Sequence, residues 1–453
     1  MLDPILNLFR GVLSHLIPNL KRDGTLRLGR YTVVSSNRWD VLRNQAAELE
    51  GQKSLLGSKS ESKRSAVFLH NAYYNFLYLA EALRERGWDA ISVCVEDPKS
   101  PSYNFYHGED RNLFDADPDC FAQNLSDFLG EIPQRFRMLH FYGIGRMALH
   151  PDRFDGSGPH LNFDRVPWDF LAFKKMGMKI GYTTSGCNDG VAQSTFREWS
   201  NGCCDLCVFQ DNPQVCSDKR NLAWGHKIAM FADLFATEGL AALDYQGIQQ
   251  SVQVPLTSVL DADIWSPDLK IPEKWRIERD DDEMLVFHSV GNFDHRSKGN
   301  RNIKGTHAIV EAVKRLRDDG LKVQLEFRTG MRNIDLRFIQ AQCDVIIDQI
   351  VFGRYGSTAR EGMMLGKPVV CRIDPSEPDG REVPAHLLEC PIVNAEVDTI
   401  YSVLKDLYFD PERRTRLGKA SRKFALKWHS KEAGAARFEE VYDRIMSGQS
   451  VSS

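Results

Sequence analysis

A glycine-rich segment in the last third of the chain has the residue types of a phosphate site. Residues 352–370 read FGRYGSTAREGMMLGKPVV, in which a glycine turn opens a short helix between two apolar stretches. Gly356, Ser357 and Thr358 would present backbone N–H groups at that helix start, which attracts phosphate through these groups and the helix dipole. Glu361 follows one turn later. Its carboxylate can accept hydrogen bonds from a ribose diol, or it can simply complement the helix dipole.

A basic loop precedes this segment. Residues 291–306 read GNFDHRSKGNRNIKGT and follow an apolar stretch. Arg binds diphosphate oxygens bidentately and Lys adds a point charge, so such a loop can stabilise a diphosphate that leaves a sugar without a metal. A solvated basic loop is the alternative interpretation. The basic or near-basic side chains of the loop are His295, Arg296, Lys298, Arg301 and Lys304.

Both segments lie where short apolar strands alternate with helical periods. The strands expected here are 284–292, 321–327, 343–350 and 367–373. The helix expected after the first of them carries Ile309, Val310, Val313 and Leu316 on one face and ends near Gly320. An earlier part of the chain alternates in the same way, with strands expected at 66–70, 90–95, 137–143 and 179–184. This alternation predicts an α/β protein with two doubly wound parallel sheets.

The chain therefore divides into four parts. We expect an N-terminal extension with an amphipathic helix and linker over 1–65, and a first Rossmann-like domain over 66–263. A second Rossmann-like domain follows over 264–427, and 428–453 forms a C-terminal helix that can pack back on the first domain, with a polar tail. Ligands of open α/β sheets bind outside the carboxyl ends of the strands, so the cleft between two such domains is the expected site.

The composition narrows the class of protein. The chain has 453 residues, of which 42% are hydrophobic and 26% charged, which excludes a largely disordered chain. Lys and Arg number 58 against 62 Asp and Glu, so the basic footprint of a nucleic-acid binder is absent. No long apolar stretch and no secretory signal stand out in the sequence, and we therefore expect a cytoplasmic protein.

The first 22 residues place apolar side chains at steps of three and four. Such a stripe predicts an amphipathic helix that lies on the inner face of a membrane as a peripheral contact, or that packs on its own protein or on a second subunit. The residues of the stripe are Leu2, Ile5, Leu6, Phe9, Val12, Leu13, Leu16, Ile17 and Leu20.

Half of the ten cysteines fall within about 30 residues of one another. They include one C-x-x-C pair and suit either a structural zinc site or small buried side chains. These cysteines are Cys187, Cys203, Cys204, Cys207 and Cys216.

The second half of the chain resembles the donor domain of the retaining glycosyltransferases of family four, which have the GT-B fold. The stretches that carry the resemblance are LDADIWSPD at 260–268, NRNIKGTHAIVEAV at 300–313, and 343–370. It extends over about 66–446 and is weaker in the first half. It implies two Rossmann-like domains facing a central cleft, of which the first binds the acceptor and the second the donor. The implied reaction moves a hexose-like sugar from a nucleotide diphosphate donor to a glycan or lipid-linked acceptor, as in polysaccharide biosynthesis. It proceeds with retention of configuration and without a catalytic metal. A non-catalytic sugar-nucleotide-binding or assembly protein on a degenerate GT-B fold is the alternative.

The resemblance also assigns donor-side residues. It implies that Arg301 and Lys304 grip the donor diphosphate and act in catalysis, and that Glu361 holds the nucleotide ribose. At Gly353 the chain departs from the family, which commonly has a glutamate there, so the contacts to the donor sugar are left unassigned. The donor-binding residues that the resemblance implies are Gly291, Arg301, Lys304, Gly356, Ser357, Thr358 and Glu361.

On the acceptor side the resemblance is less specific. The stretch LHFYG at 139–143 is similar to a family strand that ends in histidines, so His140 is expected either to act in catalysis or to be structural. Tyr74 and Asn75 lie in the loop that would face the cleft after the first strand. Asp189 can touch an acceptor hydroxyl or form a turn.

Overall fold

The computed structural model of the chain describes residues 26–28, 31–33, 64–69, 74, 76–142, 173–174, 176–184, 204–207, 209–213, 216–218, 232–236, 251–252, 254–291, 293, 304–374 and 383–450. The predicted N-terminal stripe at residues 1–22 lies outside them. The first described elements are β1 (Leu26–Leu28) and β2 (Tyr31–Val33), which pair antiparallel.

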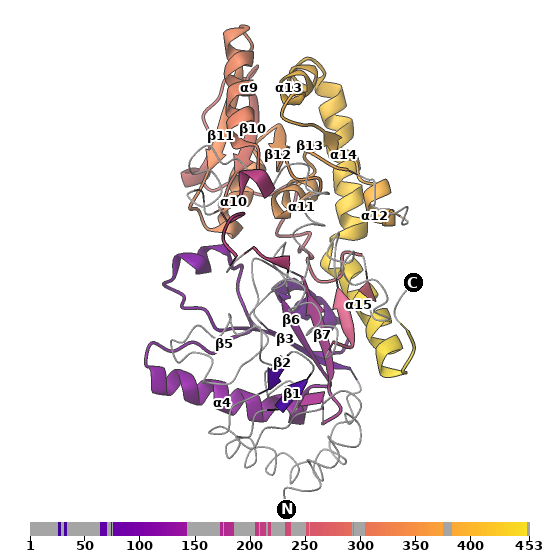
Figure 1. The fold of residues 1–453 in the computed structure, drawn as a ribbon. Helices are drawn as coiled ribbons and strands as arrows, with labels where there is room; N and C mark the ends of the chain where they lie inside the picture. Colours follow the sequence, from indigo (N-terminus) through magenta and orange to yellow (C-terminus); the bar gives the residue numbers. More distant parts are fainter. Residues whose placement is uncertain are drawn as a thin grey trace, which may run out of the picture.

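The first domain is built on a seven-stranded parallel sheet (Figure 1). Its strand order is β5-β4-β3-β6-β7-β8-β9, which places the reversal of strand order, the topological switch point, between β3 and β6. β3 has no exposed residue, as expected of a central parallel strand covered on both faces. The strands are β3 (Ser65–Leu69), β4 (Asp89–Cys94), β5 (Arg111–Asn112), β6 (Met138–Tyr142), β7 (Lys179–Thr183), β8 (Leu234–Ala236) and β9 (Ser251–Val252).

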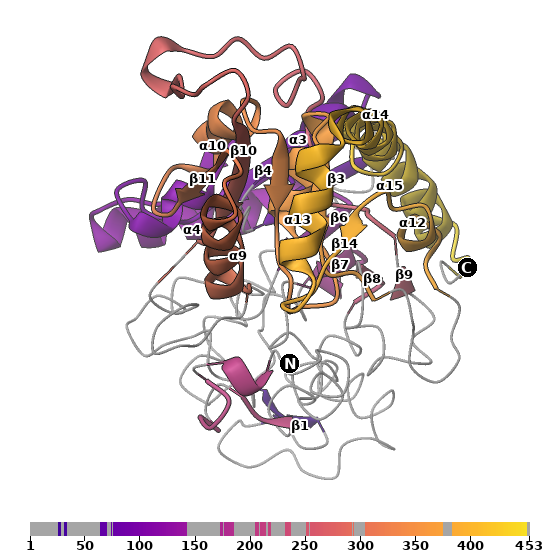
Figure 2. The same ribbon diagram turned by 90° about the horizontal axis from the view of Figure 1, so that it is seen from above.

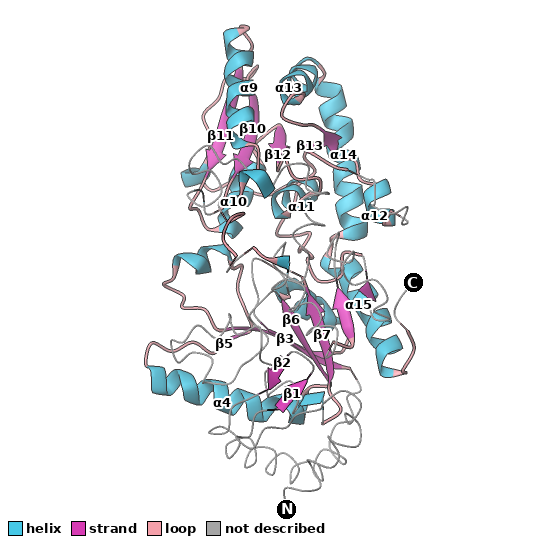
Figure 3. Cartoon of the chain, in the orientation of Figure 1, coloured by secondary structure: helices cyan, strands magenta, loops and turns pink. Residues whose placement is uncertain are grey.

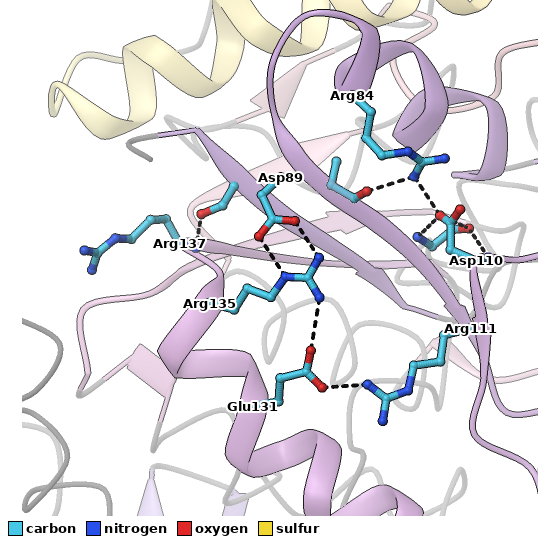
Figure 4. A network of polar contacts seen from close by, with 10 residues as sticks. Arg84, Asp89, Asp110, Arg111, Glu131, Arg135 and Arg137 are labelled. Atoms are coloured by element: carbon cyan, nitrogen blue, oxygen red, sulfur yellow. Dashed lines mark hydrogen bonds and ion pairs between the residues drawn. The ribbon is translucent and has the colours of Figure 1, made fainter. Parts of the chain in front are cut away.

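Polar contacts at its surface join the helices of this domain to its sheet. The helices are α3 (Leu77–Glu85), α4 (Pro118–Arg135) and the short 3₁₀ helix η2 (Pro101–Phe105). Arg135, at the end of α4, donates to both carboxylate oxygens of Asp89 at 2.7 Å, and Glu131 bridges Arg135 to Arg111 (Figure 4). These side chains are partly exposed, so each pair stabilises the domain only weakly.

The second domain contains a five-stranded parallel sheet with the order β11-β10-β12-β13-β14. Its switch point lies between β10 and β12, where the order reverses. Figure 3 shows the two groups of strands, one above the other, each flanked by helices. The strands are β10 (Met284–Ser289), β11 (Val323–Arg328), β12 (Val345–Ile347), β13 (Val369–Cys371) and β14 (Val393–Asn394).

The helices of the second domain follow its strands in alternation. α9 buries Ile309, Val313 and Leu316, but Val310 is 44% exposed, so its predicted place on the buried face is wrong. A residue directly after Ile309 lies about 100° further round the helix and faces solvent. Gly320, with φ +84°, follows the end of α9, where an αL residue is common. The helices are α9 (Thr306–Asp318), α10 (Asn333–Gln340), α11 (Ser357–Met364), α12 (Ala385–Leu388), α13 (Ile400–Phe409) and α14 (Pro411–Trp428).

The chain passes between the two domains twice. The proline-rich segment before β10 leads into the second domain, and α15 (Lys431–Met446) returns to pack against α3 of the first. The two crossings meet, because Leu260 pairs with Ser430 in an isolated parallel bridge. Figure 2 shows α14 and α15 following one another along one side of the molecule.

A buried carboxylate fixes α15 to the first domain. Glu439 accepts hydrogen bonds from Arg64, Arg86 and the indole of Trp88. The ring of Trp88 lies 4.5 Å from that of Tyr442.

The prediction of an α/β protein with two doubly wound parallel sheets is confirmed, and with it this aspect of the GT-B fold. The exact domain limits stay predictions. Within the described residues, no helix is long and apolar enough to cross a membrane.

Candidate functional site

Lys304 forms a buried ion pair at the switch point of the second sheet. Its Nζ donates to Oδ1 of Asp348 at 3.1 Å and to the carbonyl oxygen of Ser289 at 3.4 Å. Ser289 ends β10 and Asp348 follows β12, the two strands that flank the switch point. The side chain of Lys304 is 12% exposed and that of Asp348 is fully buried. Two of the three ammonium N–H groups thus have partners in the described part of the chain, which leaves one for a ligand.

Only glycine fits at position 305, directly after Lys304. Its φ of +80° is in the left-handed region, and a Cβ at this position would clash with the side chain of Ile350. The carbonyl oxygen of Lys304 accepts from the N–H of Ile350 at 3.1 Å, so the backbone lies directly against the segment after β12. This close approach holds Lys304 beside Asp348.

Asp348 also organises the start of α11. Its Oδ2 accepts the backbone N–H of Gly356 at 2.5 Å, and a Cβ at position 356 would lie 3.2 Å from that oxygen. The N–H of Gly356, which the sequence assigns to phosphate, therefore has a protein partner in this structure. No side-chain hydrogen bond caps α11, so the N–H groups of Ser357 and Thr358 are the better candidates for an anion.

Sequence reasoning missed Asp348. It lies inside the stretch CDVIIDQI at 343–350, which predicts a strand as a whole and draws no attention to the aspartate that follows its apolar centre. An acidic residue directly after a buried parallel strand was the available signal, since ligands bind at the carboxyl ends of such strands.

Glu361 is a buried carboxylate with one unused oxygen. It is 1% exposed, and its Oε2 accepts from Nε2 of Gln340 at 2.9 Å. Its Oε1 is buried without a hydrogen-bond partner among the described residues. Burial raises the pKa of Glu361 to about 7, although hydrogen bonds from Gln340 and Asn333 act in the opposite direction. A buried acceptor without a partner suits a ligand that donates a hydrogen bond.

Helix α10, which was not predicted, joins this carboxylate to the first domain. Asn333 and Gln340 lie seven residues apart and hence on one face of α10. Asn333 lies beside Glu361, and its Oδ1 is hydrogen-bonded to Nε2 of His107 from the first domain. The hydroxyl of Tyr78 lies 3.2 Å from Nδ1 of that histidine.

His107 is fixed between the domains as a neutral ring. Burial lowers the pKa of His107 to about 3. A neutral imidazole that donates from Nε2 to Asn333 must accept at Nδ1, so the hydroxyl of Tyr78 is the donor there. The ring of His107 stacks on that of Trp265, in the segment that leads into the second domain, with 4.9 Å between the ring centres.

The glycine turn before α11 is tied to the second crossing between the domains. The hydroxyl of Tyr355 lies 2.9 Å from Nε2 of His429, a residue that immediately precedes the bridge at Ser430. The ring of Tyr355 also packs edge-on against Phe424 of α14. The turn that starts α11 is thereby hydrogen-bonded to the segment through which the chain returns to the first domain.

The backbone of an aspartate lies next to Gly353, which itself has no carboxylate. The backbone N–H of Asp374 donates to the carbonyl oxygen of Gly353 at 3.0 Å, and a Cβ at 353 would lie 3.2 Å from Cβ of Asp374. Arg354 is buried and donates to the carbonyl oxygens of Gly353 and Asp374. Asp374 follows β13, so tertiary structure brings it to a place that local sequence could not indicate.

Only part of the basic loop is described. Gly291 faces the first domain, where an added Cβ would lie 2.9 Å from the ring of Phe105. The predicted diphosphate ligand Arg301 lies outside the described residues, as do His295, Arg296 and Lys298.

The structure places His140 in the core of the first domain. It is fully buried, its Nε2 lies 2.7 Å from the hydroxyl of Thr183, and its ring packs edge-on against Phe76. Only glycine fits beside it at position 181. Burial lowers the pKa of His140 to about 3. Its Nδ1 has no hydrogen-bond partner in the described part of the chain. The packing favours the structural alternative, and the catalytic role of His140 stays a prediction.

The other acceptor-side residues are only partly visible. Asn75 and Asp189 lie outside the described residues. Tyr74 is fully buried against Trp265 and His107, at the junction of the domains.

The described cysteines do not converge on a metal. No group of three or more His, Cys, Asp or Glu side chains suited to a metal ion is found among the described residues, which include Cys204, Cys207 and Cys216. Cys187 and Cys203 lie outside them.

No family model and no curated protein matches the chain. Among solved structures, the chain is similar to sucrose-phosphate synthase from Thermosynechococcus elongatus, with 15% identity and a TM-score of 0.49 over 85% of this chain and 100% of that one. The catalytic domain of starch synthase IV from Arabidopsis thaliana, bound to ADP and acarbose, has 12% identity and a TM-score of 0.49 over 85% and 99%. Anabaena HepE in complex with UDP-glucose has 11% identity and a TM-score of 0.48 over 84% of this chain and 99% of that one. Function is therefore inferred from the side chains of the site.

Proposed function

We propose that the chain is a glycosyltransferase that moves a hexose-like sugar from a nucleotide diphosphate donor to a glycan or lipid-linked acceptor. The observation that carries this proposal is the meeting of Lys304, the start of α11 and the unused oxygen of Glu361 at the carboxyl ends of β10 and β12. This is the place where open α/β sheets bind nucleotides. The resemblance in sequence adds retention of configuration and independence from a catalytic metal.

The diphosphate would lie at the N-terminus of α11. When the bond from the sugar to the diphosphate oxygen breaks, the diphosphate keeps the electron pair and gains negative charge, while the acceptor hydroxyl bonds to the sugar and passes its proton to the departing diphosphate. Lys304 and the N–H groups of Ser357 and Thr358 would stabilise that charge. Because Asp348 neutralises much of the charge of Lys304, we expect Arg301 to supply the net positive charge.

The nucleoside would lie against Glu361. Its unused oxygen would accept a hydrogen bond from a ribose hydroxyl, which removes the cost of a buried acceptor without a partner. Asp374, next to Gly353, would provide the carboxylate for the donor sugar that position 353 lacks. Asn75 and Asp189 stay predictions for the acceptor side.

The decisive experiment is a thermal-shift panel of nucleoside diphosphates and nucleotide sugars. Ligand at 100 times its Kd should stabilise the native protein by about 2.7 kcal/mol. We expect a base-selective shift that is lost in Glu361→Gln. The matched control is Glu326→Gln, which changes a carboxylate that is also buried but lies on β11 and is paired with Arg328. If no nucleotide or nucleotide sugar shifts the wild type, the proposal is wrong.

Turnover then separates an enzyme from a binding protein. Release of the nucleoside diphosphate from the stabilising donor should require an added acceptor and should be abolished in the double variant Lys304→Met/Asp348→Asn. The double variant is needed because Lys304→Met alone leaves Asp348 as a buried, unpaired charge. Binding without turnover would favour the non-catalytic alternative.

A further inference from the structure

Glu361 and two residues near it each carry a buried polar atom without a hydrogen-bond partner in the part of the chain that the structure describes. These atoms are Oε1 of Glu361, Oε1 of Gln340 and the hydroxyl oxygen of Tyr74. All three residues are at most 1% exposed. Most buried polar side-chain atoms have a partner, so three such atoms on neighbouring residues indicate a ligand.

Tyr74 comes from the first domain, whereas the other two residues belong to the second. It lies between β3 and α3, at the carboxyl end of a central strand of the first sheet. Its hydroxyl nevertheless lies beside the side chains of Ser357 and Arg360 of α11 and near Glu361. The ring of Trp265, 6.4 Å away, packs against it from the segment that connects the domains.

A second set of contacts fixes Tyr74 relative to the same carboxylate. The ring of His107 lies 5.1 Å from that of Tyr74, and His107 is hydrogen-bonded to Asn333, which lies beside Glu361. The position of the Tyr74 ring is therefore set by packing against His107, which is itself hydrogen-bonded to the second domain.

The chemistry of the three atoms fits a vicinal diol. The amide oxygen of Gln340 can only accept hydrogen bonds, as can Oε1 of Glu361 when its carboxyl is ionised, whereas the hydroxyl of Tyr74 can also donate one. A diol offers two O–H donors for the two acceptors, and its oxygens can accept from the phenol. A diphosphate has no such donors, and two acceptor oxygens would repel it.

We propose that Tyr74 is a donor-site residue contributed across the domain junction, where its hydroxyl binds the ribose diol together with Glu361 and Gln340. This inference rests on the proposed function and deepens it, because it moves Tyr74 from the acceptor side to the nucleoside. The ribose site is then complete only when the first domain stands against the second.

The test compares Tyr74→Phe with the wild type by calorimetric titration of the nucleoside diphosphate that gives the largest thermal shift. We expect a Kd about 3- to 10-fold weaker, as for the loss of one hydrogen bond. Without ligand the thermal midpoint should be unchanged or higher, because the substitution removes a buried hydroxyl that has no partner. A merely structural tyrosine would behave in the opposite way, with a lower midpoint and an unchanged Kd.

Two controls make the result specific. Tyr442→Phe removes a phenol hydroxyl from α15, away from the site, and should leave the Kd unchanged. The 2′,3′-dideoxy analogue of the same nucleotide lacks the diol and should bind wild type and Tyr74→Phe equally.

An unchanged Kd in Tyr74→Phe, together with loss of binding in Glu361→Gln, would overturn the role of Tyr74 and leave the proposed function intact. Equal weakening for the dideoxy analogue would also overturn it, since Tyr74 would then contact another part of the nucleotide. Absence of binding to the wild type would overturn both proposals.

Discussion

The two domains have sheets of the same kind but different residues at their switch points. In the second domain, β10 and β12 lead to the buried pair of Lys304 and Asp348. In the first, β3 and β6 carry Phe68 and His140, whose rings lie 5.9 Å apart, and Phe438 of α15 covers both. Among the described residues, the buried ion pair lies just beyond the strands of the second domain, whereas the aromatic contacts of the first lie within its strands. The residues directly after β3 and β6 lie outside the described part of the chain. The fold supplies the position, and the side chains decide whether chemistry can occur there.

The two domains differ most in the burial of their ion pairs, and this difference predicts the largest change in the free energy of unfolding. Asp348→Ala should lower the free energy of unfolding by about 3 to 5 kcal/mol, because Lys304 is left as a buried charge without its partner. Asp89→Ala, which breaks the partly exposed pair with Arg135 in the first domain (Figure 4), should cost at most about 1 kcal/mol. Urea denaturation of both variants measures the difference. Adding Lys304→Met to Asp348→Ala should restore much of the loss, and equal costs at the two sites would contradict the comparison.

Two buried glutamates should respond to pH with opposite signs. The raised pKa of Glu361, about 7, means that its contribution to stability is fully present below its unfolded pKa of 4.5 and is lost as the pH rises through 7. Glu361→Gln should therefore be more stable than the wild type at pH 8, by up to roughly 3 kcal/mol, since one pKa unit corresponds to about 1.4 kcal/mol. At pH 4 the two should be alike.

Glu439 provides the matched variant for this test. Its burial alone would raise its pKa, but hydrogen bonds from Arg86 and Trp88 and the charges of Arg86 and Arg64 outweigh burial and lower the pKa. The contribution of Glu439 to stability is present above its pKa in the unfolded state and is lost as the pH falls through its pKa in the folded state. Glu439→Gln should thus be less stable than the wild type at pH 8. Calorimetry at pH 4 and pH 8 measures the stability of both variants, and a change in the same direction for the two would contradict the prediction.

At His140 we expect a smaller effect than at Asp348 or Glu361, and on stability alone. His140→Asn removes a buried ring from contacts with Phe76 and Thr183 and should cost about 1 to 2 kcal/mol. Sugar transfer per folded molecule should stay unchanged. A kcat lower by about 100-fold or more at an unchanged thermal midpoint would instead give His140 a role as general acid or base.

Periodicity predicted most of the second domain because its central strands, β10, β12 and β13, are buried on both faces and its helices are amphipathic. It missed α10, whose eight residues include one arginine and one aspartate and give only a short apolar pattern. It misjudged Val310, because a run of adjacent apolar residues cannot all face one side of a helix.

The sequence by itself determined the elements and the residues whose role depends on local backbone. Gly305 followed by α9, the turn before α11 and Glu361 one turn later are set by neighbouring residues, since a left-handed glycine and a helix start are local structures.

Only the tertiary structure decided which side chains from distant segments meet. It placed Asp348 against Lys304, His107 against Asn333, and Tyr74 beside α11. It also left Oε1 of Glu361 without a partner. Burial and pairing depend on the packing of whole sheets and domains, and these long-range contacts set the charge, the pKa and the unused hydrogen-bonding capacity of the site.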